Sequence, residues 1–117
     1  MKIIYVAGPY RADLPWGVDR NVHRAREAGV TVALAGAMPL IPHANTAHFD
    51  GLAPDAFWLE GTLELLRRCD AVYVFSENWK ASSGTRNEVA EATRLGLPVF
   101  YPDDIRAMQE WIKAGEL

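Results

Sequence analysis

Four short apolar runs alternate with longer segments of helical periodicity along these 117 residues. The runs are rich in β-branched and aromatic residues, and such continuous apolar runs are typical of strands buried on both faces of a parallel sheet. Alternation of this kind predicts a parallel α/β sheet with right-handed crossovers and with helices covering both of its faces. The expected strands are residues 3–7, 38–41, 71–75 and 98–101.

Helical periodicity fills the segments between the expected strands, and polar residues stand where each helix would begin. Gly36 and Gly96 suit two of the helix ends, because glycine readily takes the left-handed conformation there. Two longer stretches, residues 8–19 and 42–54, lack this periodicity and are expected to be loops. The expected helices run from Asp19 or Asn21 to Ala35, from Asp55 to Arg68, from the segment before Glu88 to about Leu95, and from Asp103 or Asp104 onward.

Neither a repeat nor a linker interrupts the alternation, so residues 1–117 are predicted to form a single domain. The expected fold is α/β, a flavodoxin-like or Rossmann-like three-layer sandwich with a mainly parallel sheet of about four strands. A strand order of 2-1-3-4 would place the switch point of the sheet between the first and third strands. The loops that follow those two strands would then meet at one edge of the sheet.

Charge and cysteine content exclude several classes of protein. The formal net charge is −3, whereas a protein that binds a nucleic-acid backbone needs a basic face. The single cysteine, Cys69, rules out an internal disulfide and fits a reducing compartment. No window approaches the length of a membrane span, and the apolar start is too short for a signal peptide. We therefore expect a soluble, cytoplasmic protein that binds neither nucleic acid nor membrane.

Residues 82–88, Ser-Ser-Gly-Thr-Arg-Asn-Glu, follow one expected strand and open an expected helix. At such a junction, backbone N–H groups beside small residues can approach an anion, and the helix dipole favours the negative charge. The carboxylate of Glu88 does not help to bind an anion. A phosphate cradle with an acid beside it therefore suggests chemistry on a phosphorylated small molecule.

Two familiar phosphate-binding motifs are absent from the sequence. It has no glycine-rich loop ending in Gly-Lys-Ser or Gly-Lys-Thr, and no Gly-x-Gly-x-x-Gly after the first strand. These absences argue against ordinary ATPases and dinucleotide-binding enzymes. His43, His48 and Asp50 are possible metal ligands, but their spacing matches no standard zinc pattern. We expect no metal and no cofactor, and a pocket wall or a plain loop explains this segment better.

Three segments, in the same order, resemble the nucleoside 2-deoxyribosyltransferase superfamily. Tyr-Val-Ala-Gly-Pro-Tyr-Arg at residues 5–11 is similar to its opening segment, and Cys-Asp-Ala-Val-Tyr-Val-Phe at 69–75 is similar to its third strand. Residues 82–88, followed by Gly-Leu-Pro-Val at 96–99, resemble its active-site segment. That superfamily includes deoxyribosyltransferases and nucleoside 5′-monophosphate N-glycosidases on a flavodoxin-like fold. The resemblance covers nearly the whole chain and is greatest to small bacterial and phage-borne members.

The resemblance implies a role for each matching residue. Glu88 stands where the family has the nucleophilic glutamate that attacks the anomeric carbon, and Tyr5 matches a tyrosine near that carboxylate. The implied reaction cleaves or transfers the N-glycosidic bond of a nucleoside or nucleoside 5′-monophosphate, and a carboxylate can stabilise its oxocarbenium-like transition state. The expected substrate-binding residues, including those matched to the 5′-phosphate, are Gly8, Pro9, Tyr10, Arg11, Ser82, Ser83, Gly84 and Asn87.

One position departs from the family pattern. The family commonly has an aspartate eight residues before the position of Asp70, and this chain has Thr62 there. Glycosyl chemistry of this kind usually needs a second carboxyl group to protonate the leaving group. Asp50, Glu60 and Glu64 are the candidate replacements, and the sequence does not select one of them.

Glu88 also has a purely structural interpretation. Thr85-x-x-Glu88 fits a capping box, in which the glutamate bonds the backbone N–H of the N-cap residue of its own helix. The alternative function is accordingly a nucleotide-sensing module that binds without turnover. The base, the sugar, the choice between hydrolysis and transfer, and the pathway are not encoded in any recognisable motif.

A homodimer or homotetramer is the expected assembly. The resemblance implies a site at a dimer interface, and the expected loops carry more apolar residues than a solvated surface needs. These residues are Leu14, Trp16, Phe49, Leu52 and Trp79. The alternative is that they fold back over their own subunit as a lid.

Overall fold

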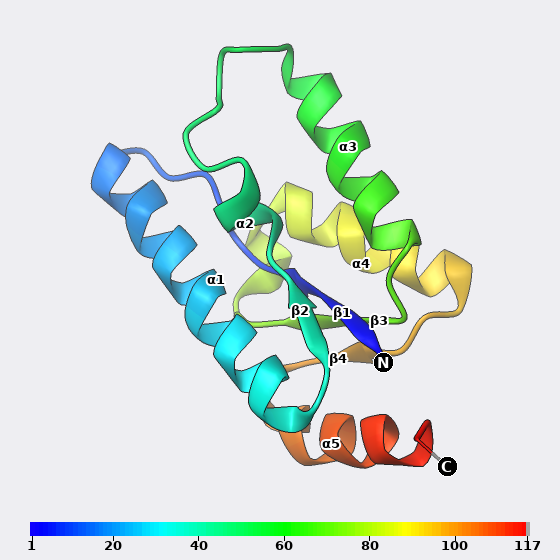
Figure 1. Cartoon of the computed structure of the whole chain (residues 1–117). Helices are drawn as coiled ribbons and strands as arrows, with labels where there is room; N and C mark the ends of the chain where they lie inside the picture. Colours follow the sequence, from blue (N-terminus) through cyan, green and yellow to red (C-terminus); the bar gives the residue numbers. More distant parts are fainter. Residues whose placement is uncertain (117) are drawn as a thin grey trace.

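The computed structural model describes residues 1–116 and contains one four-stranded sheet in the order β2-β1-β3-β4 (Figure 1). All three strand pairs are parallel, with Tyr5 of β1 lying between Leu40 of β2 and Val72 of β3. The predicted α/β class and the predicted strand order 2-1-3-4 are therefore confirmed. The strands are β1 (Ile3–Ala7), β2 (Met38–Leu40), β3 (Ala71–Val74) and β4 (Val99–Phe100).

Helices cover both faces of this sheet, as the alternation predicts. Side chains of α1 and α5 share one hydrophobic core with Ile4 and Val6, and side chains of α3 and α4 share another with Tyr5 and Ala7. The two cores arise because successive side chains of a strand point to opposite faces. The helices are α1 (Pro15–Ala35), α2 (Pro42–Asn45), α3 (Asp55–Arg67), α4 (Ser83–Leu95) and α5 (Ile105–Ala114).

Helix α1 begins earlier than the expected start at Asp19 or Asn21. Pro15 occupies its first turn, where the fixed φ of proline suits a helix and its missing N–H removes no bond. The loop after β1 is consequently only residues 8–14, shorter than expected. The end at Ala35 is as predicted, and Gly36 follows it with a left-handed φ of 107°.

The segment of residues 42–54, expected to be irregular throughout, contains the short helix α2. Helix α3 then begins at Asp55 with Pro54 preceding it, so Asp55 lies in the first turn and not at the cap. Before α5, the turn Pro102–Asp104 is a 3-10 helix, and the Asp104 carboxylate accepts from the Tyr101 N–H at 2.9 Å. Asp104 therefore caps that turn, and its side chain makes no capping bond to α5.

Within residues 1–116, no helix combines the length and the apolar content that crossing a membrane requires.

Candidate active site

The start of α4 is fixed by Ser82, which precedes the helix in an extended conformation. Its hydroxyl accepts from the backbone N–H of Thr85 at 3.2 Å and from the Thr85 hydroxyl at 3.0 Å. Ser82 is therefore the N-cap, and Thr85 is already the third residue of the helix. The capping-box interpretation of Thr85 and Glu88 is wrong, because Glu88 lies one turn too far along to reach the N-cap.

Glu88 points into the molecule, toward the centre of the sheet. Its residue surface is only 8% exposed, and its carboxylate accepts a hydrogen bond from the hydroxyl of Tyr5 on β1. Tyr5 is fully buried. The contact joins residues 83 positions apart in sequence, and it links α4, which packs on β3 and β4, to the neighbouring strand β1.

Burial sets the protonation of this pair. It raises the pKa of Glu88 from 4.5 to about 7, because the charged form loses its hydration, although the hydrogen bond from Tyr5 lowers the pKa. The pKa of Tyr5 is raised well above 10, first by burial and then by the charge of Glu88. Near pH 7 the phenol therefore remains protonated beside a carboxyl group that is poised between its two forms.

Thr62 lies at the same point of the structure. Hydrogen bonding by its side chain lowers the pKa of Tyr5 and partly offsets the rise that burial and Glu88 cause. The Thr62 hydroxyl also donates to the Leu59 carbonyl at 3.0 Å, within α3. The position where the family resemblance expects an aspartate thus does reach the Tyr5–Glu88 pair, but it carries a hydroxyl group there.

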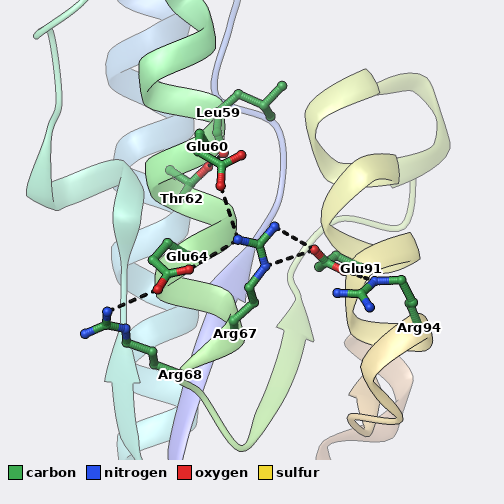
Figure 2. A network of polar contacts seen from close by, with 8 residues as sticks. All are labelled: Leu59, Glu60, Thr62, Glu64, Arg67, Arg68, Glu91 and Arg94. Atoms are coloured by element: carbon green, nitrogen blue, oxygen red, sulfur yellow. Dashed lines mark hydrogen bonds and ion pairs between the residues drawn. The ribbon is translucent and has the colours of Figure 1, made fainter.

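Two of the three candidate acids lie elsewhere. Glu60 and Glu64 are each 3.2 Å from the guanidinium of Arg67, which also bonds Glu91 of α4 at 3.0 Å (Figure 2). A helix turns by about 100° per residue, so positions 60 and 64 lie roughly 200° around α3 from Thr62. These two carboxylates therefore join a surface network that ties α3 to α4.

The third candidate, Asp50, belongs to a connection between two loops. It accepts from the Tyr10 hydroxyl at 2.8 Å, and that hydroxyl in turn accepts from the backbone N–H of His48 at 2.9 Å. Arg11, which the resemblance matches to a phosphate-binding position, pairs with Asp55 at 3.2 Å, with 70% of its side chain exposed. Residues 8–11 are thereby connected to the segment before α3.

The expected phosphate cradle is open to solvent at the start of α4. A Cβ atom built on Gly84 would meet nothing within 4 Å, and Ser83 and Asn87 are exposed or half-exposed around it. Arg86 donates to the Lys80 carbonyl at 2.6 Å, which brings its positive charge to the same end of the helix. Sequence spacing alone gives no signal for this contribution from Arg86.

His43, His48 and Asp50 do not converge on one point. Nε2 of His43 lies 3.0 Å from the carbonyls of Gly8 and Pro9, whereas Nε2 of His48 lies 2.6 Å from Asp19. Among residues 1–116, no three acidic, histidine or cysteine side chains are grouped as metal ligands would be.

Comparisons with known proteins agree with this fold. The model of the family described as Domain of unknown function (DUF7768) matches residues 2–102. No curated protein matches the chain significantly. Among solved structures, the chain is similar to a 2-deoxyribosyltransferase from the psychrotolerant bacterium Bacillus psychrosaccharolyticus, with a TM-score of 0.60 and 20% identity. That similarity covers 85% of this chain and 70% of the other, and it shows a nucleoside 2-deoxyribosyltransferase-like fold.

Proposed function

The chain belongs to the DUF7768 family, and we propose that it cleaves or transfers the N-glycosidic bond of a nucleoside or nucleoside 5′-monophosphate, with Glu88 as the nucleophile. The observation that carries the proposal is the buried contact of Glu88 with Tyr5 at the switch point of the sheet. Open parallel sheets bind ligands at this place. The shared fold supports the same class of reaction, glycosyl transfer from a nucleoside.

In the proposed first step, the Glu88 carboxylate attacks the anomeric carbon of the sugar. The bond from that carbon to the base breaks, its electron pair remains on the base nitrogen, and the departing base takes up a proton from solvent water. The product on the protein is a glycosyl ester of Glu88. Water or a second base then attacks the same carbon, releases the carboxylate and loses a proton to solvent, which completes hydrolysis or transfer.

Tyr5 has a positioning part in this scheme. Its hydroxyl donates to Glu88 and keeps its proton at neutral pH, because its pKa is raised. The hydrogen bond holds the carboxylate in one orientation and partly compensates its lost hydration. At the start of α4, the N–H groups of Ser83 and Gly84 have no acceptor within residues 1–116 and are free for a phosphate, with Arg86 beside them.

The test is release of free base from a panel of nucleosides and their 5′-monophosphates, measured by chromatography. We expect release from at least one member, with monophosphates bound more tightly than nucleosides. Equal affinity for both classes would contradict the phosphate cradle. Binding without any release over long incubation would contradict catalysis.

A specific observation favours a second candidate function, a nucleotide-sensing module. Thr62 supplies no carboxyl group beside Tyr5, while Glu60 and Glu64 are engaged by Arg67 and Asp50 by Tyr10. In this arrangement, none of the three expected carboxyl groups is free to protonate the leaving base. Tight nucleotide binding with no base released is the result that this alternative predicts.

We further propose that the protein is a homodimer or a dimer of dimers, with each neighbour closing a site. The segment before α3 projects away from the sheet (Figure 1), and its apolar side chains lack cover. Trp79 differs from the expectation, because it packs against Tyr101 of its own chain. Sedimentation at low micromolar concentration tests the assembly, and a fully active monomer would contradict it. Leu14, Trp16, Phe49, Leu52 and Phe57 are among the exposed apolar residues of the chain.

A further inference from the structure

His43 is a buried polar residue that the proposed chemistry does not use. It lies in α2, is only 7% exposed, and places Nε2 at 3.0 Å from both the Gly8 and the Pro9 carbonyl oxygens. A carbonyl oxygen can only accept, so Nε2 must carry the proton and donate to both. One side chain thus holds two consecutive carbonyls of the loop after β1.

The ring of His43 is fixed by aromatic neighbours on two sides. It meets Tyr10 edge-on with ring centroids 5.6 Å apart, and Phe75 in the same way at 5.7 Å. Gly8 lies directly against Phe75, since a Cβ atom there would come within 2.1 Å of that ring. The loops that follow β1, β2 and β3 therefore meet around one imidazole.

Asn21 continues the same pattern along the loop. Its side-chain amide donates to the Tyr10 carbonyl at 3.0 Å, so three successive carbonyls, from Gly8 to Tyr10, are held by side chains of α1 and α2. In the described part of the chain, the N–H groups of Tyr10 and Arg11 donate to no backbone carbonyl. Holding the carbonyls leaves these N–H groups available at the carboxyl edge of the sheet.

The imidazole is suited to a fixed donor role. Burial lowers the pKa of His43, so the ring is neutral near pH 7 and carries a single proton. The groups that face Nε2 are backbone carbonyls, which fix that proton on Nε2. A neutral donor buried in this way holds the backbone without adding a charge to the site.

We propose that His43 is a positioning residue that sets the path of residues 8–11 by donating to the Gly8 and Pro9 carbonyls. The loop keeps one conformation at the carboxyl end of β1 because Nε2 of His43 holds the Gly8 and Pro9 carbonyls. The consequence for ligand binding rests on the proposed function, whereas the anchoring of the loop does not.

Limited proteolysis tests the anchoring without any ligand. Arg11 provides a trypsin site inside the loop, and cleavage there can be compared by mass spectrometry with cleavage after Arg20 and Lys80. The variant H43L removes the donor, and H43Q keeps an N–H donor at a similar reach. The control is V32A, which opens a cavity in the core on the α1 face and leaves the loop contacts intact.

All variants are compared at the same interval below their own melting temperatures. We expect H43L to speed cleavage after Arg11 at least tenfold relative to the other two sites, H43Q to restore most of the protection, and V32A to affect the three sites alike. A cleavage pattern of H43L that matches V32A would overturn the proposal, because His43 would then only fill space.

Kinetics with the nucleotide found active in the panel give a second measurement. We expect H43L to raise KM about tenfold with kcat changed less than threefold, and H43Q to recover most of the loss. An unchanged KM in H43L would overturn the role in ligand binding. If no nucleotide is turned over, the proposed function fails, and the proteolysis result still decides the anchoring.

Discussion

Two glutamates on one face of α4 lie in opposite environments. Glu88 is buried against the protonated phenol of Tyr5, and this burial raises its pKa to about 7. Glu91, three residues further on, contacts the guanidinium groups of Arg94 and Arg67, and these hydrogen bonds lower its pKa (Figure 2). The two side chains lie only about 60° apart around the helix, and the facing element determines their chemistry.

The difference separates a reactive carboxylate from a structural one. A carboxylate satisfied by two arginines is held in its charged form and has little basicity left. A buried carboxylate with a phenol as its single partner remains reactive, and its burial lowers the stability of the folded protein. On this basis Glu88 is the candidate nucleophile, and Glu91 ties α4 to α3.

The largest expected difference is in turnover. E88Q keeps the shape of the side chain and removes the anionic nucleophile, so we expect base release to fall at least about 10³-fold while nucleotide binding persists. E91Q is the matched control and should change turnover much less. Single-turnover assays of both variants measure the rate of base release. Equal losses of rate in E88Q and E91Q would contradict the assignment of Glu88 as the nucleophile.

The pH dependence of turnover should report Glu88. Because its raised pKa is about 7, the reactive anion is scarce at pH 5 and predominates at pH 8. We expect kcat/KM to rise roughly tenfold per pH unit below pH 7 and to level off above it, about 100-fold in all between pH 5 and the plateau. A profile that is flat from pH 5 to pH 8 would contradict the assignment.

The contributions of Glu88 and Glu91 to the free energy of unfolding should change with pH in opposite directions. The pKa of Glu88 is raised on folding, so its favourable contribution is fully present below about pH 4.5 and is lost as pH rises through 7. The gap between 4.5 and about 7 corresponds to about 3 kcal/mol. Denaturant unfolding at pH 8 should therefore show E88Q to be more stable than the unmodified protein by about 2–3 kcal/mol, with the gain vanishing below pH 4.5.

The pKa of Glu91 is lowered, so its contribution is present above the ordinary value near 4.5 and is lost as pH falls below it. E91Q should thus be less stable than the unmodified protein at pH 8. If E88Q and E91Q change the free energy of unfolding in the same direction at pH 8, Glu88 and Glu91 do not differ in the way that we infer.

The smallest expected effect concerns Arg67. R67A removes the link from α3 to Glu91 and leaves Glu60 and Glu64 facing each other without their cation. The loss of stability should be small and should shrink in 1 M salt, because these groups are in contact with water. The control is R106A, which removes an exposed ion pair between Arg106 and Glu110, both within α5. A loss that is independent of salt would indicate that Arg67 acts through packing.

The fold and the ends of two helices could be predicted from sequence for local reasons. Apolar runs identify β1 and β3, and Gly36 and Gly96 close α1 and α4 where a left-handed residue is needed. The sequence places the start of α1 too late, because Asp19 and Asn21 resemble caps and Pro15 resembles a loop residue. A proline at the first helical position is itself a start signal, so this boundary was available in the sequence.

The candidate site could be predicted only in part. Resemblance to a family selected Glu88 and Tyr5, and the structure brings these two side chains into contact. Spacing within α4 allowed Glu88 either to cap the helix or to face inward, and only the position of Ser82 decides between them. The bond from Arg67 to Glu91 spans 24 positions and the bond from His43 to Gly8 spans 35, beyond any local pattern.

The most direct test of the central claim is a carbon-13 NMR titration of the side-chain carboxyls of Glu88 and Glu91 in one sample, assigned with E88Q and E91Q. The structure predicts a midpoint of about pH 7 for Glu88 and a midpoint below 4.5 for Glu91. A midpoint for Glu88 near 4.5 would mean that its carboxyl group is hydrated, and would contradict the buried Tyr5–Glu88 site from which the function is inferred.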